Sequence, residues 1–280
     1  MPYKLFKKFP KQLAGLFTVL FAVLLLAACE SGQVTTVLPS AGTDAKAVAE
    51  SDGLVLVAGA TGGTGKMVVK HLLDDGYDVR VLVRNLDKAE ALWGDSVAYA
   101  KGDVRRPAEL IPAMQGVTSV ISAIGASPTS KRSRPEDVDF GGVRNLADVA
   151  AASNVQHFVL VSSAGVTQED HFLNKMFNNV LIWKAKGEDA LRASGVPYTI
   201  VRPGGLTDKP GGKSVIVFAQ GDTTSGSITR EDVALICVAA LSQPNAVGKT
   251  FETYASTAGA PVKTDWKARF ASLQSDSGAD

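Results

Sequence analysis

The sequence predicts one doubly wound α/β domain, in which helices cover both faces of a parallel β-sheet. Short apolar runs rich in β-branched residues alternate with longer helical patterns, and these runs are apolar throughout rather than at every second position. A chain of 280 residues, with 45% hydrophobic and 20% charged residues, can bury such a core. We expect the domain to occupy residues 53–260, with a small irregular region towards its end and a C-terminal tail over 261–280.

The predicted strands and helices follow one another in order. Strands are expected at 54–58, 79–83, 96–103, 119–125, 157–163, 198–203 and 250–255. Helices are expected at 66–75, 87–93, 107–114, 143–154 and 233–243, and the long stretch after residue 163 ends in a helical pattern over 184–195. Between 204 and 227 turn residues surround one further strand, and Thr229 to Asp232 form a capping-box start for the last helix. Residues 272–280 are expected to fray.

The first 28 residues have the pattern of an export signal, with a flexible tether over 29–52. Lysines precede the apolar run, which closes with Leu26-Ala27-Ala28-Cys29 and is similar to the bacterial lipobox, where the cysteine is diacylated. An uncleaved anchor is the alternative, because the run approaches the ~18 apolar residues needed to span a bilayer. Both alternatives predict membrane attachment, and the lysines favour an extracytoplasmic domain on a bacterial cell membrane.

The composition restricts which classes of ligand and which kinds of metal or disulfide chemistry are expected. The 29 basic and 28 acidic residues nearly cancel, which argues against nucleic acid and favours a small neutral or anionic ligand. The two cysteines, Cys29 and Cys237, exclude a disulfide framework, and the three histidines have no metal-ligand spacing, so no metal site is expected. Cys237 lies among apolar helix positions and is interpreted as a core residue.

Three glycines stand between the first strand and the first helix. Gly59, Gly62 and Gly65 allow the backbone to approach a pyrophosphate closely, and the following helix directs free N–H groups at that anion. A nucleotide-hydrolysing P-loop is the alternative. It is disfavoured because Ala60 replaces the first glycine of that motif and Met67 replaces its magnesium-binding hydroxyl residue.

The end of the second strand predicts which dinucleotide binds. An acidic residue is expected there in an NAD site, whereas this chain has Arg84, whose guanidinium suits a 2′-phosphate. NADP(H) is therefore favoured over NAD(H). The alternative is an exposed arginine that merely ends a strand. Arg80 is a weaker second candidate, and Asp87 opposes the preference.

Several motifs together resemble one family. VAGATGGTGK, VLVRN, KGDV, ISAIGA, FVLVSSAGV and WKAKGEDALRASGVPYTIVRPGGL, in this order, resemble the atypical short-chain dehydrogenase/reductases with NmrA-like NAD(P)-binding domains. The likeness is strongest to the plant and cyanobacterial NADP-binding branch, and it covers about residues 53–255. It implies a Rossmann-like fold.

The resemblance also implies roles for individual residues. The pyrophosphate would lie on Gly59, Thr61, Gly62, Gly63, Thr64 and Gly65, and the 2′-phosphate on Arg84. Asp103 and Val104 would flank the adenine, and Ala123, Ile124 and Gly125 would pass beneath its ribose. Ser162, Ser163, Lys184, Pro203 and Gly204 would lie on the nicotinamide side, with Lys184 bonded to that ribose. Lys184 and Ser163 are the candidate catalytic residues, and a plain solvated helix lysine is the alternative for Lys184.

One residue of the full reductase family is missing. A tyrosine normally stands four residues before the lysine and handles the proton that accompanies hydride transfer, but this chain has Val180 there. Two functions remain open: a reductase whose small-molecule substrate takes its proton from water or an improvised donor, or a non-catalytic NADP(H) sensor that acts through a protein partner. Ser163 and His171 are the local donor candidates, although His171 also fits a plain loop residue. An exported domain would need a source of a cofactor that is otherwise cytosolic.

Overall fold

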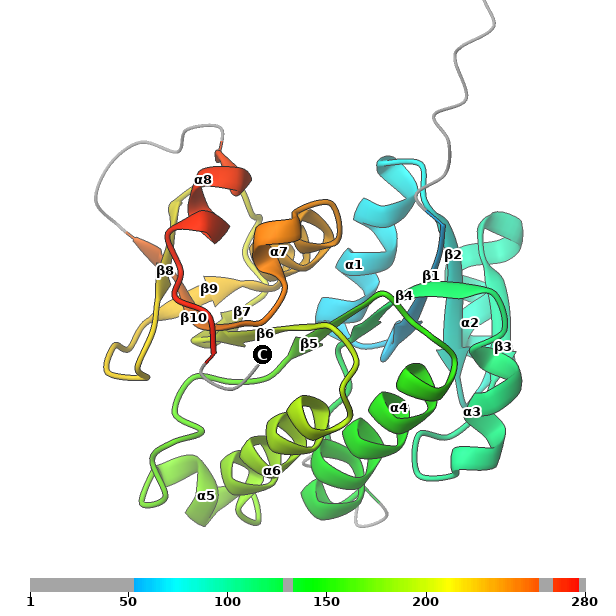
Figure 1. Ribbon diagram of the computed structural model, residues 1–280, viewed down its shortest axis with the longest axis horizontal. Helices are drawn as coiled ribbons and strands as arrows, with labels where there is room; N and C mark the ends of the chain where they lie inside the picture. Colours follow the sequence, from blue (N-terminus) through cyan, green and yellow to red (C-terminus); the bar gives the residue numbers. More distant parts are fainter. Residues whose placement is uncertain (1–52, 128–132, 257–263, 277–280) are drawn as a thin grey trace, which may run out of the picture. The chain divides into compact units, whose positions relative to one another are not determined.

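The computed structural model describes residues 53–127, 133–256 and 264–276, and Figure 1 shows helices on both sides of a central sheet. The predicted leader, the tether and Cys29 lie outside these residues. Within the described ranges, none of the helices has the length and apolar character needed to cross a membrane.

The main sheet has eight strands in the order β3-β2-β1-β4-β5-β6-β10-β8, and β8 alone is antiparallel to its neighbour. The strands are β1 Leu54–Ala58, β2 Asp78–Val83, β3 Ala98–Lys101, β4 Val117–Ser122, β5 His157–Val161, β6 Tyr198–Pro203, β8 Val215–Ala219 and β10 Lys249–Ser256. Two short strands, β7 Gly205–Thr207 and β9 Ser227–Thr229, pair separately. The predicted doubly wound parallel sheet is confirmed. The strand order reverses at β1, where ligands bind in such sheets.

Helices form a layer on each face of the sheet. They are α1 Gly63–Asp74, α2 Leu86–Trp93, α3 Pro107–Ala113, α4 Gly141–Ala152, α5 Phe172–Met176, α6 Val180–Ala193, α7 Arg230–Leu241 and α8 Trp266–Ala271. Apolar side chains of α1, α2, α7 and α8 pack on one face, and those of α3, α4 and α6 pack on the other. The strands are buried from both sides, which explains their uninterrupted apolar sequences.

Some predicted boundaries are wrong. Strand β4 ends at Ser122, so Ala123 to Gly125 lie beyond the sheet. No start was predicted for α6, which begins at Val180 after two asparagines with positive φ. A π-helical turn at Glu136–Phe140 precedes α4 and was not predicted. The region after Pro203 holds β7 and β9 in addition to the expected β8.

The expected fraying of the tail is wrong for residues 272–276. Leu273 is buried against the core, and the Asp276 carboxylate accepts hydrogen bonds from Tyr198 Oη at 2.9 Å and Thr250 Oγ1 at 2.6 Å. Helix α8 adds Phe270, whose ring lies 5.9 Å from that of Phe251 in β10. Aromatic burial therefore fixes a segment that the polar sequence alone did not reveal.

Candidate functional site

The three glycines of the first turn form a close backbone cup. Gly59 has φ +85° and begins a turn in which Gly62 N donates to Gly59 O at 2.9 Å. A Cβ on Gly59 would lie 2.5 Å from the carbonyl oxygen of Ala123, and a Cβ on Gly65 would overlap the Gly59 carbonyl. Helix α1 follows with no side-chain cap and no acidic residue in its first turn. Its N–H groups therefore remain available to an anion.

A cavity of about 190 Å³ adjoins this cup at the carboxyl ends of the neighbouring strands. Its predicted lining residues are Gly59, Thr61, Gly62, Arg84, Asp103, Val104, Ala123, Ile124 and Gly125. Leu82, Val83, Gly102, Ser133 and Val138 complete it and were not predicted. Gly102 stands in the quoted KGDV motif, and a Cβ there would lie 3.0 Å from Leu82 Cδ1, which explains the glycine. The structure thus brings the predicted adenosine-side residues to one place.

The electrostatics of this cavity depend on Arg84 and Asp103. Arg84 is exposed at the end of β2 and makes no hydrogen bond or ion pair within the described part of the chain. The Asp103 carboxylate accepts from Arg105 Nε at 2.9 Å, and hydrogen bonding to Arg105 lowers the pKa of Asp103 to about 2 despite partial burial. Asp103 is therefore ionised at neutral pH and is already paired, whereas the Arg84 guanidinium is open to a ligand.

Arg80 does not face this cavity. Its guanidinium donates to the carbonyl oxygens of Ala113 at 2.9 Å and Gln115 at 2.6 Å. These contacts tie β2 to the loop after α3. Arg80 as a second cofactor candidate is wrong, because its donors satisfy backbone carbonyls. Asp87 is exposed in the first turn of α2.

Lys184 in α6 lines a narrow crevice next to this cavity, and Ile124 borders both. Its Nζ lies 2.7 Å from Asp139 Oδ1, and the side chain of Asp139 is fully buried. The other carboxylate oxygen of Asp139 accepts from Ala126 N at 2.9 Å, next to the cavity-lining Gly125. Lys184 is therefore not a plain solvated lysine, since only 18% of its side chain is exposed. Sequence reasoning missed Asp139 because the unpredicted π-helical turn directs it inward.

Ser162 and Ser163 follow β5 but make different contacts. Ser162 Oγ is buried and donates to Glu188 Oε1 at 2.5 Å, and Ser162 lines a narrow crevice with Lys184 and Ile124. Ser163 is half-buried, and its hydroxyl donates to Ala164 O at 2.9 Å. Ser163 thus has the more accessible hydroxyl. The cofactor contacts of both serines stay predictions.

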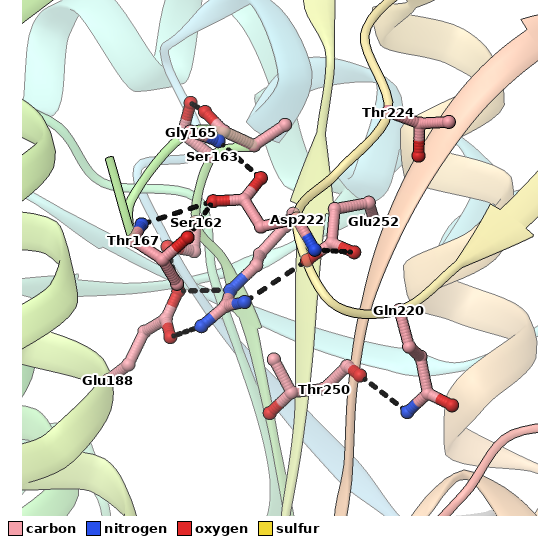
Figure 2. A network of polar contacts seen from close by, with 12 residues as sticks. Ser162, Ser163, Gly165, Thr167, Glu188, Gln220, Asp222, Thr224, Thr250 and Glu252 are labelled. Carbon is pink, nitrogen blue, oxygen red and sulfur yellow. Dashed lines mark hydrogen bonds and ion pairs between the residues drawn. The ribbon is translucent and has the colours of Figure 1, made fainter. Parts of the chain in front are cut away.

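A polar network is joined to Ser162 through Glu188 (Figure 2). Arg202 donates to Glu188 Oε2 at 2.6 Å and to Glu252 Oε1 at 3.1 Å, so two buried carboxylates share one guanidinium. Asp222 accepts from Gly165 N at 2.6 Å and from Thr167 Oγ1 at 2.8 Å, and its own N–H donates to Glu252. The network fixes the loop that follows Ser163 to the β8–β9 connection.

The structure also places the remaining residues that were predicted for the site. Gly63, Thr64 and Gly65 form the first turn of α1. Pro203 ends β6 and accepts from Ala164 N at 2.9 Å, and Gly204 packs against Tyr254 and the Gly226 carbonyl, outside the 190 Å³ cavity. His171 caps α5, with Nδ1 accepting from Leu173 N at 3.2 Å.

The structure also shows where two residues lie for which no role in the site was predicted. Cys237 is fully buried, and burial raises the pKa of its thiol to about 12, which confirms it as a core residue. Val180 is the first residue of α6, one turn before Lys184. Among the described residues, no group of histidine, cysteine, aspartate or glutamate could hold a metal ion.

Comparison with known proteins decides the family. Residues 59–244 match the family described as NAD(P)H-binding. The chain belongs to this NAD(P)H-binding family. Within it, the protein is similar to sanguinarine reductase of Eschscholzia californica, with 36% identity over 261 residues that cover 78% of this chain and 95% of the relative.

Two further relatives place this NAD(P)H-binding protein among the atypical short-chain dehydrogenase/reductase-like proteins. Protein TIC 62 of Pisum sativum chloroplasts is 38% identical over 187 residues, which cover 59% of this chain and 35% of that protein. A Bacillus halodurans structure described as a "putative NAD-dependent epimerase/dehydratase" is 27% identical, with a TM-score of 0.66 over 73% of this chain and 94% of that one. The expected relation to the plant branch is confirmed.

The described residues fit a nicotinamide dinucleotide. Gly59 and Gly65 leave backbone space that a Cβ would fill, and α1 directs its first N–H groups into that space. Gly59, Arg84 and Gly125 border a single cavity, while Lys184 lies beyond Gly125. A Cβ on Gly125 would be 3.9 Å from Lys184 Nζ. The site therefore runs from the adenosine side towards the two serines.

Proposed function

We propose that this protein is an NADPH-dependent reductase that prefers NADP(H) to NAD(H). The observation that carries the preference is Arg84, which borders the 190 Å³ cavity and also a second cavity of about 280 Å³. Lys101 and Arg106 line the second cavity with Asp103 and Glu109. The carboxylates of Asp103 and Glu109 are paired with Arg105 and Arg106. Arg84, which has no partner among the described residues, is therefore the group offered to a 2′-phosphate.

The reductase chemistry is supported by the relatives and by the crevice at Lys184. NADPH, when bound, supplies a hydride to the substrate. Lys184 would hold the nicotinamide ribose, and Ser163 presents the accessible hydroxyl at the end of β5. The named activity of the Eschscholzia californica relative, which aligns over 95% of its length, supports reduction over simple binding.

The source of the proton separates this protein from tyrosine-dependent reductases. A lysine normally lowers the pKa of the nearby phenol, but here Val180 holds the phenol's position and the Lys184 ammonium pairs with a buried carboxylate. We infer that the proton comes from water or from Ser163, not from a phenol. The preferred substrates are acceptors that take up a hydride readily, such as flavins and quinones.

Mixing the purified protein with NADPH and a flavin or quinone tests the proposal. We expect the nicotinamide absorbance to fall only when the acceptor is present, and faster with NADPH than with NADH. Constant absorbance, together with saturable NADPH binding, would instead support the sensor that acts through a protein partner. A Lys184→Met variant separates the two functions further, because a reductase would lose turnover.

We also propose that the chain is attached to a bacterial cell membrane through a lipid on Cys29, with the domain on the extracytoplasmic face. The lysine-rich start, the apolar run and the Leu26-Ala27-Ala28-Cys29 sequence support this attachment. Labelling with a radioactive fatty acid tests it. Incorporation that is lost in Cys29→Ala is the expected result, and equal incorporation in both proteins would refute lipidation at this residue.

A further inference from the structure

Gly63 leaves a space that an arginine from another helix fills. A Cβ on Gly63 would lie 2.6 Å from Arg230 Cδ and 2.7 Å from Arg230 Nε. Arg230 is the first residue of α7, which packs along α1 (Figure 1). The arginine side chain therefore crosses from one helix to the first turn of the other, next to the backbone cup of the glycines.

The backbone of Gly63 does not itself require glycine. Gly63 is not among the residues with positive φ, and it occupies the first position of α1, where alanine has the higher helix propensity by about 1 kcal/mol. A Cβ at this position would instead require the Arg230 side chain to move. The sequence thus keeps room for a guanidinium beside the N-terminus of α1.

Arg230 stands where a cation does not stabilise its own helix. The N-terminus of a helix favours acidic side chains, and α7 has two of them, Glu231 and Asp232, in the same turn. Because Arg230 reaches Gly63, the positive ends of α7 and α1 lie close together around this guanidinium. Such an arrangement favours an anion with more than one negative charge.

The ion pair that Arg230 forms within the protein is weak. Arg230 Nη1 lies 2.8 Å from Asp208 Oδ1, and the two side chains are 30% and 86% exposed. An ion pair this exposed contributes about 0–1 kcal/mol. Within the described ranges Asp208 is the one partner of the Arg230 guanidinium, which has five N–H donors. A ligand can therefore replace Asp208 at little cost.

We propose that Arg230 is a further cofactor-binding residue. Its guanidinium binds the diphosphate of the dinucleotide from the side of α7, while the N-terminal N–H groups of α1 bind the same diphosphate. Asp208 forms an ion pair with the Arg230 guanidinium when no cofactor is bound, and this ion pair breaks when the diphosphate binds. This inference rests on the dinucleotide binding described above, but not on the choice between NADPH and NADH, because both contain the diphosphate.

Fluorescence titration of the full chain with NADPH and NADH tests the role of Arg230. We expect Arg230→Ala to weaken both nucleotides about tenfold, which corresponds to one charge-assisted hydrogen bond, and to leave their affinity ratio unchanged. Asp208→Asn should tighten both. Lys70→Ala is the matched control: it removes one positive charge from the last turns of α1, where Lys70 forms an ion pair with the exposed Asp74, and should change neither affinity.

Gly63→Ala provides an independent variant that keeps the charge. Its Cβ would displace Arg230, so we expect weaker nucleotide binding with an unchanged or higher melting temperature. In the Arg230→Ala background the same substitution should have no further effect on affinity. Equal affinities of Arg230→Ala and the unmodified protein, or fully additive effects of the two substitutions, would overturn the proposal.

Adenosine 2′-monophosphate separates this proposal from the NADP(H) preference, since it has a 2′-phosphate but no diphosphate. Arg230→Ala should bind it as the unmodified protein does, whereas Arg84→Ala should bind it more weakly. If the unmodified protein bound NADH and NADPH equally, the preference would fail, while a loss in Arg230→Ala would still support the diphosphate contact. A loss of adenosine 2′-monophosphate binding in Arg230→Ala would overturn the diphosphate contact.

Discussion

Lys184 Nζ lies 2.7 Å from the fully buried Asp139 Oδ1. This pair joins α6 to the π-helical turn before α4, and Asp139 also accepts from Ala126 N beside Gly125, which lines the 190 Å³ cavity. The Asp139 carboxylate therefore fixes Lys184 beyond Gly125, and Val180, one turn earlier in α6, offers no phenol.

Asp139→Asn tests this arrangement. The substitution keeps the shape and the acceptor for Ala126 N but removes the charge that holds Lys184, so we expect NADPH affinity to fall about tenfold, the effect of one charge-assisted hydrogen bond. Asp148→Asn on the exposed face of α4 is the control and should bind NADPH normally. Unchanged affinity in Asp139→Asn would show that Lys184 needs no partner.

Arg84 determines the expected cofactor preference. Arg84→Asp replaces a guanidinium suited to a 2′-phosphate by a carboxylate that can accept from ribose hydroxyls and repels the phosphate. We expect the ratio of NADPH to NADH affinity to fall by more than about tenfold, with stability unchanged, because the side chain is exposed. Dissociation constants for the two nucleotides check this, and an unchanged ratio would place the 2′-phosphate elsewhere.

Gly65→Ala should close the backbone cup. The added Cβ would overlap the Gly59 carbonyl, and the backbone has no flexible side chain to move aside, so we expect loss of NADPH binding and a cost of about 1–3 kcal/mol in the free energy of unfolding. Gly141→Ala in α4 is the matched control. At Gly141 the nearest atom would be 3.4 Å away and φ is −58°, so alanine should be tolerated. Urea unfolding and nucleotide titration measure both effects.

Arg202 is expected to be the most sensitive position of the buried network. Arg202→Met would remove the cation that pairs with the Glu252 carboxylate, which is 1% exposed, whereas Glu188 would keep its ion pair with Arg192 at 3.1 Å. Breaking a buried pair in this way costs about 3–5 kcal/mol. Denaturant unfolding measures the loss, and a loss below about 1 kcal/mol would show that solvent already screens the network.

His157 predicts a pH dependence of stability. Its ring is buried beside Thr199, and burial lowers its pKa from 6.5 to about 4. Between these values the unfolded chain binds the proton and the folded chain does not, so the stabilising contribution is complete above pH 6.5 and is lost as pH falls to 4. His157→Gln should reduce the loss of unfolding free energy across this range by about 2–3 kcal/mol. An unchanged pH profile would contradict the assignment.

The sequence predicted the sheet well because its strands are buried on both faces. The strand 54–58 and the strand 198–203 match β1 and β6, since uninterrupted β-branched runs specify this environment strongly. Gly59 and Arg84 were predicted to lie at one site because each follows such a strand in the chain, and both line the same cavity. Most of the other predicted lining residues came from the family resemblance, and their cofactor contacts stay predictions.

Long-range contacts could not be predicted in the same way. Asp139 depends on a π-helical turn, Arg230 meets Gly63 from a helix 167 positions later in the numbering, and Asp276 is fixed by Thr250 and Tyr198. None of these pairs leaves a periodic pattern in the sequence. The polar residues 274–276 therefore gave no indication that they pack on the sheet.

Titration of the detergent-solubilised full chain with NADPH, NADH and ATP tests the central claim most directly. We expect saturable binding of NADPH, weaker binding of NADH through the same cup, and no competition by ATP at equal concentration. Binding of ATP as tight as that of NADPH, or no binding of either nicotinamide nucleotide, would contradict the account.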